Sequence, residues 1–242
     1  MKTVLITGAG GRIGQVLREQ LAGRYALRLQ GRAGGTSLGA ARPGEEIVTA
    51  NLTDLDAMRL AVRGVDAVIH LAASPGTRDP WEEILPNNLI GQYHLLEAMR
   101  QEGVRRMVFA STNHVTGMYE RDTRPCYPDI PVRPDSLYGA SKAFGEALAR
   151  YYVDEYALEV ICLRIGSFQP QPKGVRQLST WLSYRDMAQL AWRSIETPLH
   201  WGIFYAISGN TRRYWDIGPT MDALGYAPED DAETYAAQIE GP

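Results

Sequence analysis

The stretch TGAGGRIGQ, residues 7–15, places three glycines in G-x-x-G-x-x-G spacing between an apolar, β-branched run and a helical pattern. The expected strand is Thr3–Thr7, and the expected helix begins near Ile13. Glycines suit this junction because the backbone must turn sharply and approach a pyrophosphate, while the helix start offers unpaired N–H groups and a positive dipole end. A plain strand-to-helix turn is the alternative. We predict a dinucleotide-binding loop built on Gly8, Gly11 and Gly14.

The first two thirds of the chain repeat this order of strand and helix. Short runs rich in Val, Ile and Leu alternate with longer helical patterns, which is typical of βαβ units and a parallel sheet. Further helical patterns begin near Leu55, Trp81 and Leu137. We therefore predict an α/β fold with a Rossmann-type doubly wound parallel sheet. The expected strands are Thr3–Thr7, Ala26–Gln30, Glu46–Ala50, Ala67–Ala72, Arg106–Ser111 and Glu159–Ile165.

The pattern changes after Ile165. The stretch SFQPQPKGVRQLSTW, residues 167–181, is interrupted by proline and glycine and is predicted to be a substrate loop. We divide the chain into a dinucleotide-binding domain over residues 1–165 and a small C-terminal substrate-binding lobe over residues 166–242, packed as one globular unit. The elements expected in this lobe are a helix over Arg185–Glu196, a strand over Gly202–Ile207 and a short helix near Asp216–Leu224.

Composition limits the classes of protein that fit. The 242 residues are 45% hydrophobic, which is enough for one sizeable core. The 25 basic and 28 acidic residues are scattered, without the basic stripe that nucleic acid requires. The two cysteines lie far apart and support neither a disulfide framework nor a zinc site, and no apolar run is long enough for a signal segment or membrane span. We expect a soluble, cytoplasmic protein without nucleic-acid, membrane or metal partners.

The second expected strand ends in LRLQGRAGG and lacks the acidic residue that usually binds the adenosine ribose. Gly31 leaves room for a ribose 2′-phosphate, Arg32 offers it a positive charge, and Arg12 could add a second cation. The residues therefore leave NAD and NADP open, with a slight preference for NADP. Asn51 follows the third strand and either holds the adenine ring or is only the polar residue of the next helix start.

The stretch YGASK sets Tyr138 four residues ahead of Lys142, so the two side chains share one helix face. A nearby ammonium group favours the phenolate, so we expect a lowered pKa for Tyr138 and a base that works near neutral pH. Two ordinary polar residues on an amphipathic helix are the alternative.

The glycine loop, HLAAS (residues 70–74), FASTNHVTG (residues 109–117) and YGASK together resemble the extended short-chain dehydrogenase/reductase superfamily. The resemblance implies that Tyr138 is the catalytic base, that Lys142 also holds the nicotinamide ribose, and that Thr112 contacts the reacting oxygen, with Ser111 as the fallback. His70 is predicted to be a packed strand residue. Asn88 matches a family asparagine or is a polar residue of a helix start. Taken with the residues above, the cofactor contacts are Gly8, Gly11, Arg12, Ile13, Gly14, Arg32, Asn51, Leu52, Leu71, Ala72, Ala73, Asn88, Tyr138, Lys142 and Ile165.

Within that superfamily, FASTNHVTGMY, RPDSLYGASK, LRIGSFQP and RQLSTWLSYRDM are similar to the uronate dehydrogenases. This resemblance implies oxidation at C1 of a cyclic hexuronic acid, glucuronate or galacturonate, to an aldarolactone, with hydride transfer to NAD or NADP. Arg176 would hold the sugar carboxylate, because a planar guanidinium pairs bidentately with a carboxylate. The implied substrate contacts are Ser74, Thr112, Asn113, His114, Ser167 and Arg176.

Other functions use the same residue types. An arginine clamp also suits phosphate, so oxidation of glucose 6-phosphate at the same carbon is one alternative. A nucleotide-sugar epimerase or dehydratase shares the Tyr, Lys and Thr core but needs a larger C-terminal domain than residues 166–242 provide. The non-enzyme alternative is an NAD(P)-sensing regulator, against which the retained Tyr138, Lys142 and Thr112 argue. The resemblance also leads us to expect a homo-oligomer.

Overall fold

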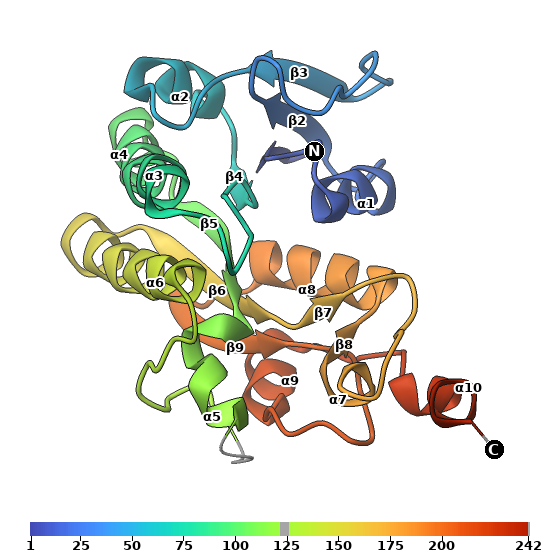
Figure 1. Cartoon of the computed structure of the whole chain (residues 1–242). Coiled ribbons are helices and arrows are strands. Elements are labelled where there is room, and N and C mark those ends of the chain that lie inside the picture. Colours follow the sequence, from blue (N-terminus) through green and yellow to red (C-terminus); the bar gives the residue numbers. More distant parts are fainter. Residues whose placement is uncertain (122–125, 242) are drawn as a thin grey trace.

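The computed structural model of the protein describes residues 1–121 and 126–241, and a parallel sheet of seven strands lies at its centre (Figure 1). The strand order is β3-β2-β1-β4-β5-β6-β9, and every neighbouring pair is parallel. The order reverses between β1 and β4, which confirms the predicted doubly wound Rossmann-type sheet. The strands are β1 Thr3–Thr7, β2 Ala26–Gly31, β3 Glu45–Thr49, β4 Ala67–His70, β5 Arg106–Thr112, β6 Glu159–Ile165 and β9 Trp201–Ala206.

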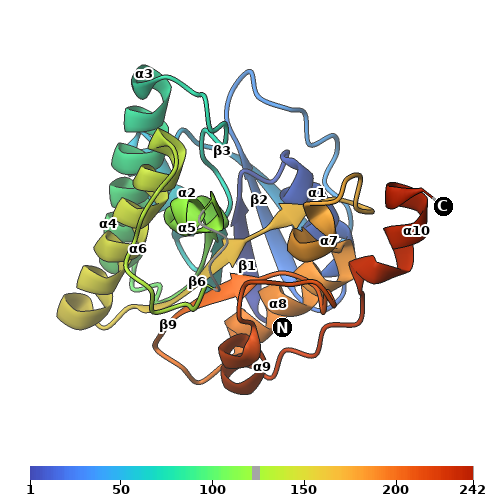
Figure 2. The same ribbon diagram turned by 60° about the horizontal axis from the view of Figure 1, so that its bottom comes forward.

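Helices cover both faces of this sheet. On one face lie α2, α4 and α6, and on the other lie α1 and α8 (Figures 1 and 2). Each face has its own hydrophobic layer, one including Leu17 and Leu190 and the other Met58 and Leu96. The helices are α1 Arg12–Gln20, α2 Leu55–Val62, α3 Trp81–Ile84, α4 Gly91–Glu102, α5 Gly117–Arg121, α6 Leu137–Tyr156, α7 Gln177–Thr180, α8 Tyr184–Glu196, α9 Gly218–Leu224 and α10 Ala236–Glu240, with a π-helical segment η1 Leu85–Ile90 and 3₁₀ segments η2 Asn113–Thr116 and η3 Ala232–Tyr235.

The starts of the longer helices follow local capping chemistry. The Asp54 carboxylate accepts a hydrogen bond from the Ala57 amide at 3.0 Å, and the Ser136 hydroxyl accepts one from the Gly139 amide at 3.1 Å. Such caps satisfy N–H groups that have no partner inside the helix. The polar residues ahead of α2 and α6 therefore set the first turn of each helix where the sequence predicts it, at Leu55 and Leu137.

Two expectations for the C-terminal part differ from the structure. The strand expected in the substrate lobe, β9, pairs with β6 and extends the central sheet. The stretch predicted as a loop contains α7 and a two-stranded ladder, in which β7 (Ser167–Phe168) pairs with β8 (Trp181–Leu182). Strands of two residues are too short to produce a sequence period, so the pattern could not reveal them.

A buried ion pair joins α6 to the sheet. The Arg164 guanidinium on β6 donates to both Glu146 carboxylate oxygens, at 3.0 and 2.9 Å, and the two side chains are only 2% and 4% exposed. The Ser111 hydroxyl on β5 also donates to Glu146, at 2.5 Å. Because a buried charge without its partner is strongly unfavourable, this cluster holds α6 against the ends of β5 and β6.

Removing one charge of this pair tests that role. We expect Glu146→Ala to lower the free energy of unfolding by about 3–5 kcal/mol, because it leaves the Arg164 charge buried and unpaired. Asp154→Ala is the control, since it removes an exposed ion pair with Arg150 on the same helix and should cost less than about 1 kcal/mol. Urea unfolding measures both, and equal losses in the two variants would contradict the role assigned to Glu146.

Candidate active site

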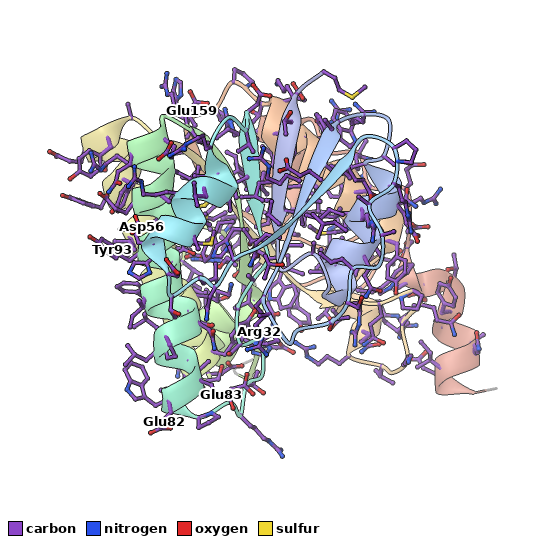
Figure 3. The ribbon with its side chains drawn as sticks, turned by 90° about the horizontal axis from the view of Figure 1, so that it is seen from above. Arg32, Asp56, Glu82, Glu83, Tyr93 and Glu159 are labelled. Carbon is purple, nitrogen blue, oxygen red and sulfur yellow. The ribbon has the colours of Figure 1, made fainter. Side chains whose placement is uncertain are left out.

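A cavity of about 970 Å³ opens at the carboxyl ends of the strands, beside the point where the strand order reverses. Open parallel sheets bind ligands at this position. Figure 3 shows Arg32 and Glu83, which both line the cavity, at one end of the sheet, while Glu159 at the start of β6 lies at the opposite end. The cavity therefore occupies the end of the fold at which a dinucleotide is expected.

The structure brings most of the residues predicted for the site into the wall of this cavity. Three predicted residues, Asn88, Ser167 and Arg176, are not in the wall and lie behind or beside it. The predicted residues that line the cavity are Gly8, Gly11, Arg12, Ile13, Gly14, Arg32, Asn51, Leu52, Leu71, Ala72, Ala73, Ser74, Thr112, Asn113, His114, Tyr138, Lys142 and Ile165.

The glycine loop is packed so closely that Gly8 and Gly14 leave no room for a side chain. Gly8 has a φ of +65°, and a Cβ on it would lie 2.8 Å from the Cα of Ala72. A Cβ on Gly14 would lie 2.6 Å from the carbonyl oxygen of Ala9. The loop therefore requires glycine for its own geometry, and it leaves a bare backbone at the start of α1 that fits a pyrophosphate.

The end of the cavity at which adenosine is expected contains an exposed cation, Arg32. Gln30 is committed to the protein, since it accepts from the Gly8 amide at 2.9 Å and donates to the Ala50 carbonyl at 2.5 Å. Within residues 1–121 and 126–241, the exposed Arg32 guanidinium makes no hydrogen bond or ion pair. Arg12 instead donates to the Phe168 carbonyl at 3.4 Å.

Asn51 belongs to the turn before α2 and lies in the cavity wall, and its contact with adenine stays a prediction. Its side-chain oxygen accepts from the Thr53 amide at 3.2 Å, which stabilises the turn before α2, and the residue also lines the cavity.

Tyr138 and Lys142 lie together in the cavity wall, but their ionisation differs from the sequence expectation. Burial raises the pKa of Tyr138 to about 12, and a hydrogen bond with Thr112 only partly opposes it. Burial also lowers the pKa of Lys142 to about 7, with its Nζ 5.8 Å from the centre of the Tyr138 ring. The expected lowering of the tyrosine pKa by this lysine is therefore wrong for the protein alone, because desolvation of the phenolate outweighs the attraction.

Neighbouring hydroxyls on β5 point to different partners. Ser111 donates to Glu146 at 2.5 Å, whereas Thr112 lies close enough to Tyr138 to oppose the rise in the pKa of that phenol. Successive side chains on a strand face opposite ways, so only one of the two can meet Tyr138. This geometry favours Thr112 over Ser111 as the partner of the reacting oxygen.

His114 is oriented by an acid behind it. Its Nδ1 is 2.9 Å from an Asp135 carboxylate oxygen, and its ring meets that of Tyr138 edge-on with centroids 6.1 Å apart. Asp135 also accepts from the Ser136 hydroxyl at 3.0 Å, and Ser136 caps α6. A ring whose Nδ1 meets a carboxylate has Nε2 left for other partners.

Asn88 supports the cavity from behind. Its side chain accepts from the Ser74 amide at 2.8 Å and donates to the Ser74 carbonyl at 3.1 Å and the Ser141 hydroxyl at 2.9 Å. It lies in the π-helical segment η1, a rare turn that is frequent at functional sites. Asn88 therefore ties the loop carrying Ser74 to α6, which carries Tyr138.

Arg176 meets a protein carboxylate rather than the cavity. It donates through Nε and Nη2 to the two carboxylate oxygens of Glu120, at 2.8 Å for Nη2, and through Nη1 to the Ser167 hydroxyl at 3.3 Å. The Ser167 hydroxyl also lies 2.8 Å from that of Thr180. These contacts place Arg176 and Ser167 in one polar cluster next to the cavity wall.

Several residues of the site had little or no recognisable signal in the sequence. Glu120, Asp135 and the Glu146–Arg164 pair act through side chains brought together from separate elements. Glu146 alone had a local signal, since it follows Lys142 by four residues on one helix face. The cavity-lining residues that the sequence did not suggest include Gln30, Thr36, Glu83, Asn87 and Phe168.

Two further observations concern the described residues as a whole. Across the described ranges, no helix combines the length and apolarity needed to cross a membrane. Nor do three or more His, Cys, Asp or Glu side chains gather there in a way that could hold a metal ion.

The parallel sheet, the glycine loop and the cavity at the strand ends define a dinucleotide-binding protein of the Rossmann class. Residues 4–177 match the NAD dependent epimerase/dehydratase family. A uronate dehydrogenase from Pseudomonas putida is 44% identical over 238 residues, which cover 98% of this chain and 87% of that relative. The chain therefore belongs to the NAD dependent epimerase/dehydratase family, as the sequence motifs predict.

The likeness extends to the C-terminus. An NAD-dependent glucose-6-phosphate dehydrogenase from Haloferax volcanii is 37% identical over 98% of this chain and 97% of its own. Among solved structures, a mutant uronate dehydrogenase from Agrobacterium tumefaciens complexed with NAD is 39% identical, with a TM-score of 0.90 over 100% of this chain and 91% of that one. The similarity thus includes the C-terminal part as well as the sheet.

A buried histidine beside this site predicts sensitivity to acid. Burial lowers the pKa of His70 to about 3, and the nearby Lys142 charge adds to this. Its Nδ1 is 2.8 Å from the Thr7 hydroxyl, and its ring stacks on Phe109. The unfolded chain binds a proton at His70 below about pH 6.5, whereas the folded chain does not until about pH 3, so stability falls as the pH falls through this window.

Lowering the pH from 6 to 4 reduces the free energy of unfolding. We expect this reduction to be about 2–3 kcal/mol smaller in His70→Gln than in the wild-type protein. Urea unfolding at both pH values measures this difference. His200→Gln is the control, because the His200 side chain is 69% exposed and its removal should leave the acid loss unchanged. An equal acid loss in His70→Gln and wild type would show that His70 does not stay neutral in the fold.

Proposed function

We propose that this protein oxidises C1 of a cyclic hexuronic acid, glucuronate or galacturonate, to an aldarolactone with NAD as the hydride acceptor. The observation that carries the proposal is the 44% identity to a uronate dehydrogenase over 98% of the chain, together with the meeting of Tyr138, Lys142 and Thr112 in one cavity. Residues 166–242 would supply the substrate side of the site.

The cofactor that we propose is NAD, in place of the NADP slightly preferred from the sequence. The family description and a relative's complex both name NAD. The bare backbone at Gly8 and Gly14 would hold the pyrophosphate, and Lys142 would hold the nicotinamide ribose. NAD, when bound, accepts the hydride that leaves C1. Arg32 has no protein partner among the described residues, so the assay below includes NADP.

Each side chain around Tyr138 has a distinct part in the proposed reaction. Tyr138 first loses its phenol proton to solvent; the phenolate oxygen then takes the proton of the C1 hydroxyl, while Thr112 holds the same substrate oxygen by a hydrogen bond. The buried Lys142 ammonium stabilises the phenolate when it forms, because opposite charges attract strongly in a site shielded from water. Asn113 and His114 would orient the sugar hydroxyls, and Arg176 with Ser167 would bind the sugar carboxylate.

The second candidate is oxidation of glucose 6-phosphate at the same carbon. It is favoured by the 37% identity to a protein of that name over nearly the whole chain, and by an arginine that suits phosphate as well as carboxylate. The epimerase and regulator alternatives gain no such support from the full-length relatives.

The assay that separates these candidates follows the absorbance of reduced nicotinamide. Glucuronate, galacturonate and glucose 6-phosphate are each supplied with NAD and with NADP. We expect reduction of NAD by the two uronates. Reduction by glucose 6-phosphate alone would move the assignment to the second candidate, and no reduction by either uronate would overturn the proposal.

Replacing the proposed base tests the mechanism. We expect Tyr138→Phe to lower kcat/KM for the uronates by about 10²- to 10⁴-fold, the usual contribution of a positioned general base. NAD binding, measured by calorimetry, should change little, because the ring and its packing stay in place. A variant that retains activity within a few fold would exclude Tyr138 as the base.

We also propose that the protein is a cytoplasmic homo-oligomer. The cytoplasm would keep the buried Cys162 thiol reduced. The outer faces of α4 and α6 carry exposed aromatic side chains, including Tyr93, Phe144 and Tyr151, which are 46%, 39% and 52% exposed. Such apolar surface is typical of contacts between protein chains. Light scattering should give a mass that is a multiple of 26.8 kDa, and the mass of one chain would contradict the proposal.

A further inference from the structure

The guanidinium of Arg176 is already occupied by a carboxylate of the protein itself. Its Nε and Nη2 donate side-on to the two oxygens of Glu120, with the second distance 2.8 Å, and Nη1 reaches the Ser167 hydroxyl at 3.3 Å. Side-on pairing of this kind is the geometry by which arginine binds a carboxylate of a ligand. A sugar carboxylate that approaches Arg176 therefore finds the Nε and Nη2 donors already bound to Glu120. The positive charge of the guanidinium is balanced by the same carboxylate.

Glu120 is placed to affect the substrate through this contact. It lies on α5, which follows directly after η2, and η2 begins with the cavity-lining Asn113 and His114. Burial raises the pKa of Glu120, but the hydrogen bond from Arg176, the nearby Tyr214 hydroxyl and the Arg176 charge together lower it by more, so the pKa lies below its ordinary value. Glu120 is therefore an anion at neutral pH, next to the groups that would hold the sugar.

We propose that Glu120 is a specificity-determining residue, which competes with the acidic group of the substrate for Arg176 and disfavours substrates that carry two negative charges. This inference rests on the function proposed above and concerns the same site. Arg176 and Glu120 together carry no net charge. A monoanionic carboxylate adds one negative charge to the pair, whereas a phosphate monoester adds nearly two at neutral pH.

The ion pair between Arg176 and Glu120 is exposed enough for a substrate acid to replace Glu120. The Arg176 side chain is 48% exposed and that of Glu120 is 21% exposed. Ion pairs open to water are weak, because water screens the attraction and the long side chains lose freedom. A sugar carboxylate can therefore share or displace Glu120, while a phosphate is repelled more strongly by the carboxylate that stays close to it.

Glu120→Gln keeps the shape of the side chain and removes its charge. We expect the KM for galacturonate to fall about threefold to tenfold and kcat/KM for glucose 6-phosphate to rise about tenfold or more, since the phosphate carries the larger charge. For D-galactose, which has the same ring without an acidic group, kcat/KM should stay within about twofold. A raised KM for galacturonate would overturn the proposal, because it would make Glu120 a residue that orients Arg176.

Two further variants isolate the effect. Glu233→Gln is the matched control, because Glu233 forms a similar exposed side-on pair with Arg212, at 2.7 and 2.9 Å, and does not line the cavity. It should leave all three substrates unchanged. Arg176→Ala should raise the KM for galacturonate but not for D-galactose, and in that background Glu120→Gln should have little further effect. If Glu120→Gln changed the kinetics as much in the Arg176→Ala background as in the wild-type protein, competition for the guanidinium would be overturned.

The outcomes separate this inference from the function on which it rests. A wild-type protein that oxidises neither uronate would overturn both. A wild-type protein that oxidises galacturonate, with all KM values unchanged in Glu120→Gln, would overturn only the role of Glu120.

Discussion

The placement of Tyr138, Lys142 and Thr112 depends on a buried ion pair between Glu146 and Arg164. Glu146 lies one turn beyond Lys142 on α6 and binds Arg164 on β6 and Ser111 on β5. Neither charge can be left alone in a poorly polarisable interior, so the helix and both strand ends have one favourable arrangement. That arrangement places Thr112, the next residue on β5, against Tyr138, one turn before Lys142.

Burial then decides how the reactive side chains ionise. It raises the pKa of Tyr138 to about 12 and lowers that of Lys142 to about 7, so the cavity disfavours charge on both. Electrostatic interactions are strong in such surroundings, and any further positive charge brought beside Tyr138 would favour its phenolate. The protein alone thus favours the neutral phenol, and additional positive charge beside it would favour the phenolate.

Two of the side chains proposed to bind the substrate, one in the cavity wall and one beside it, are each backed by an acid. His114 is held by Asp135, and Arg176 is held by Glu120. Each carboxylate orients its partner, and Glu120 also offsets the positive charge of Arg176. Under the proposed function, the site would therefore select its substrate by the arrangement of several polar groups more than by a large excess of positive charge.

The sequence by itself determined the elements that local forces control. Glycine spacing, capping residues and the apolar runs of β1, β4, β5 and β6 predicted the sheet and most of the lining of the cavity, because these features act within a few residues. Only the tertiary structure decided the pairing of β9 with β6, the short β7–β8 ladder, the direction of the tyrosine pKa shift and the contact of Arg176 with Glu120. Each of these depends on burial or on side chains from distant segments, and no local pattern records which segments meet.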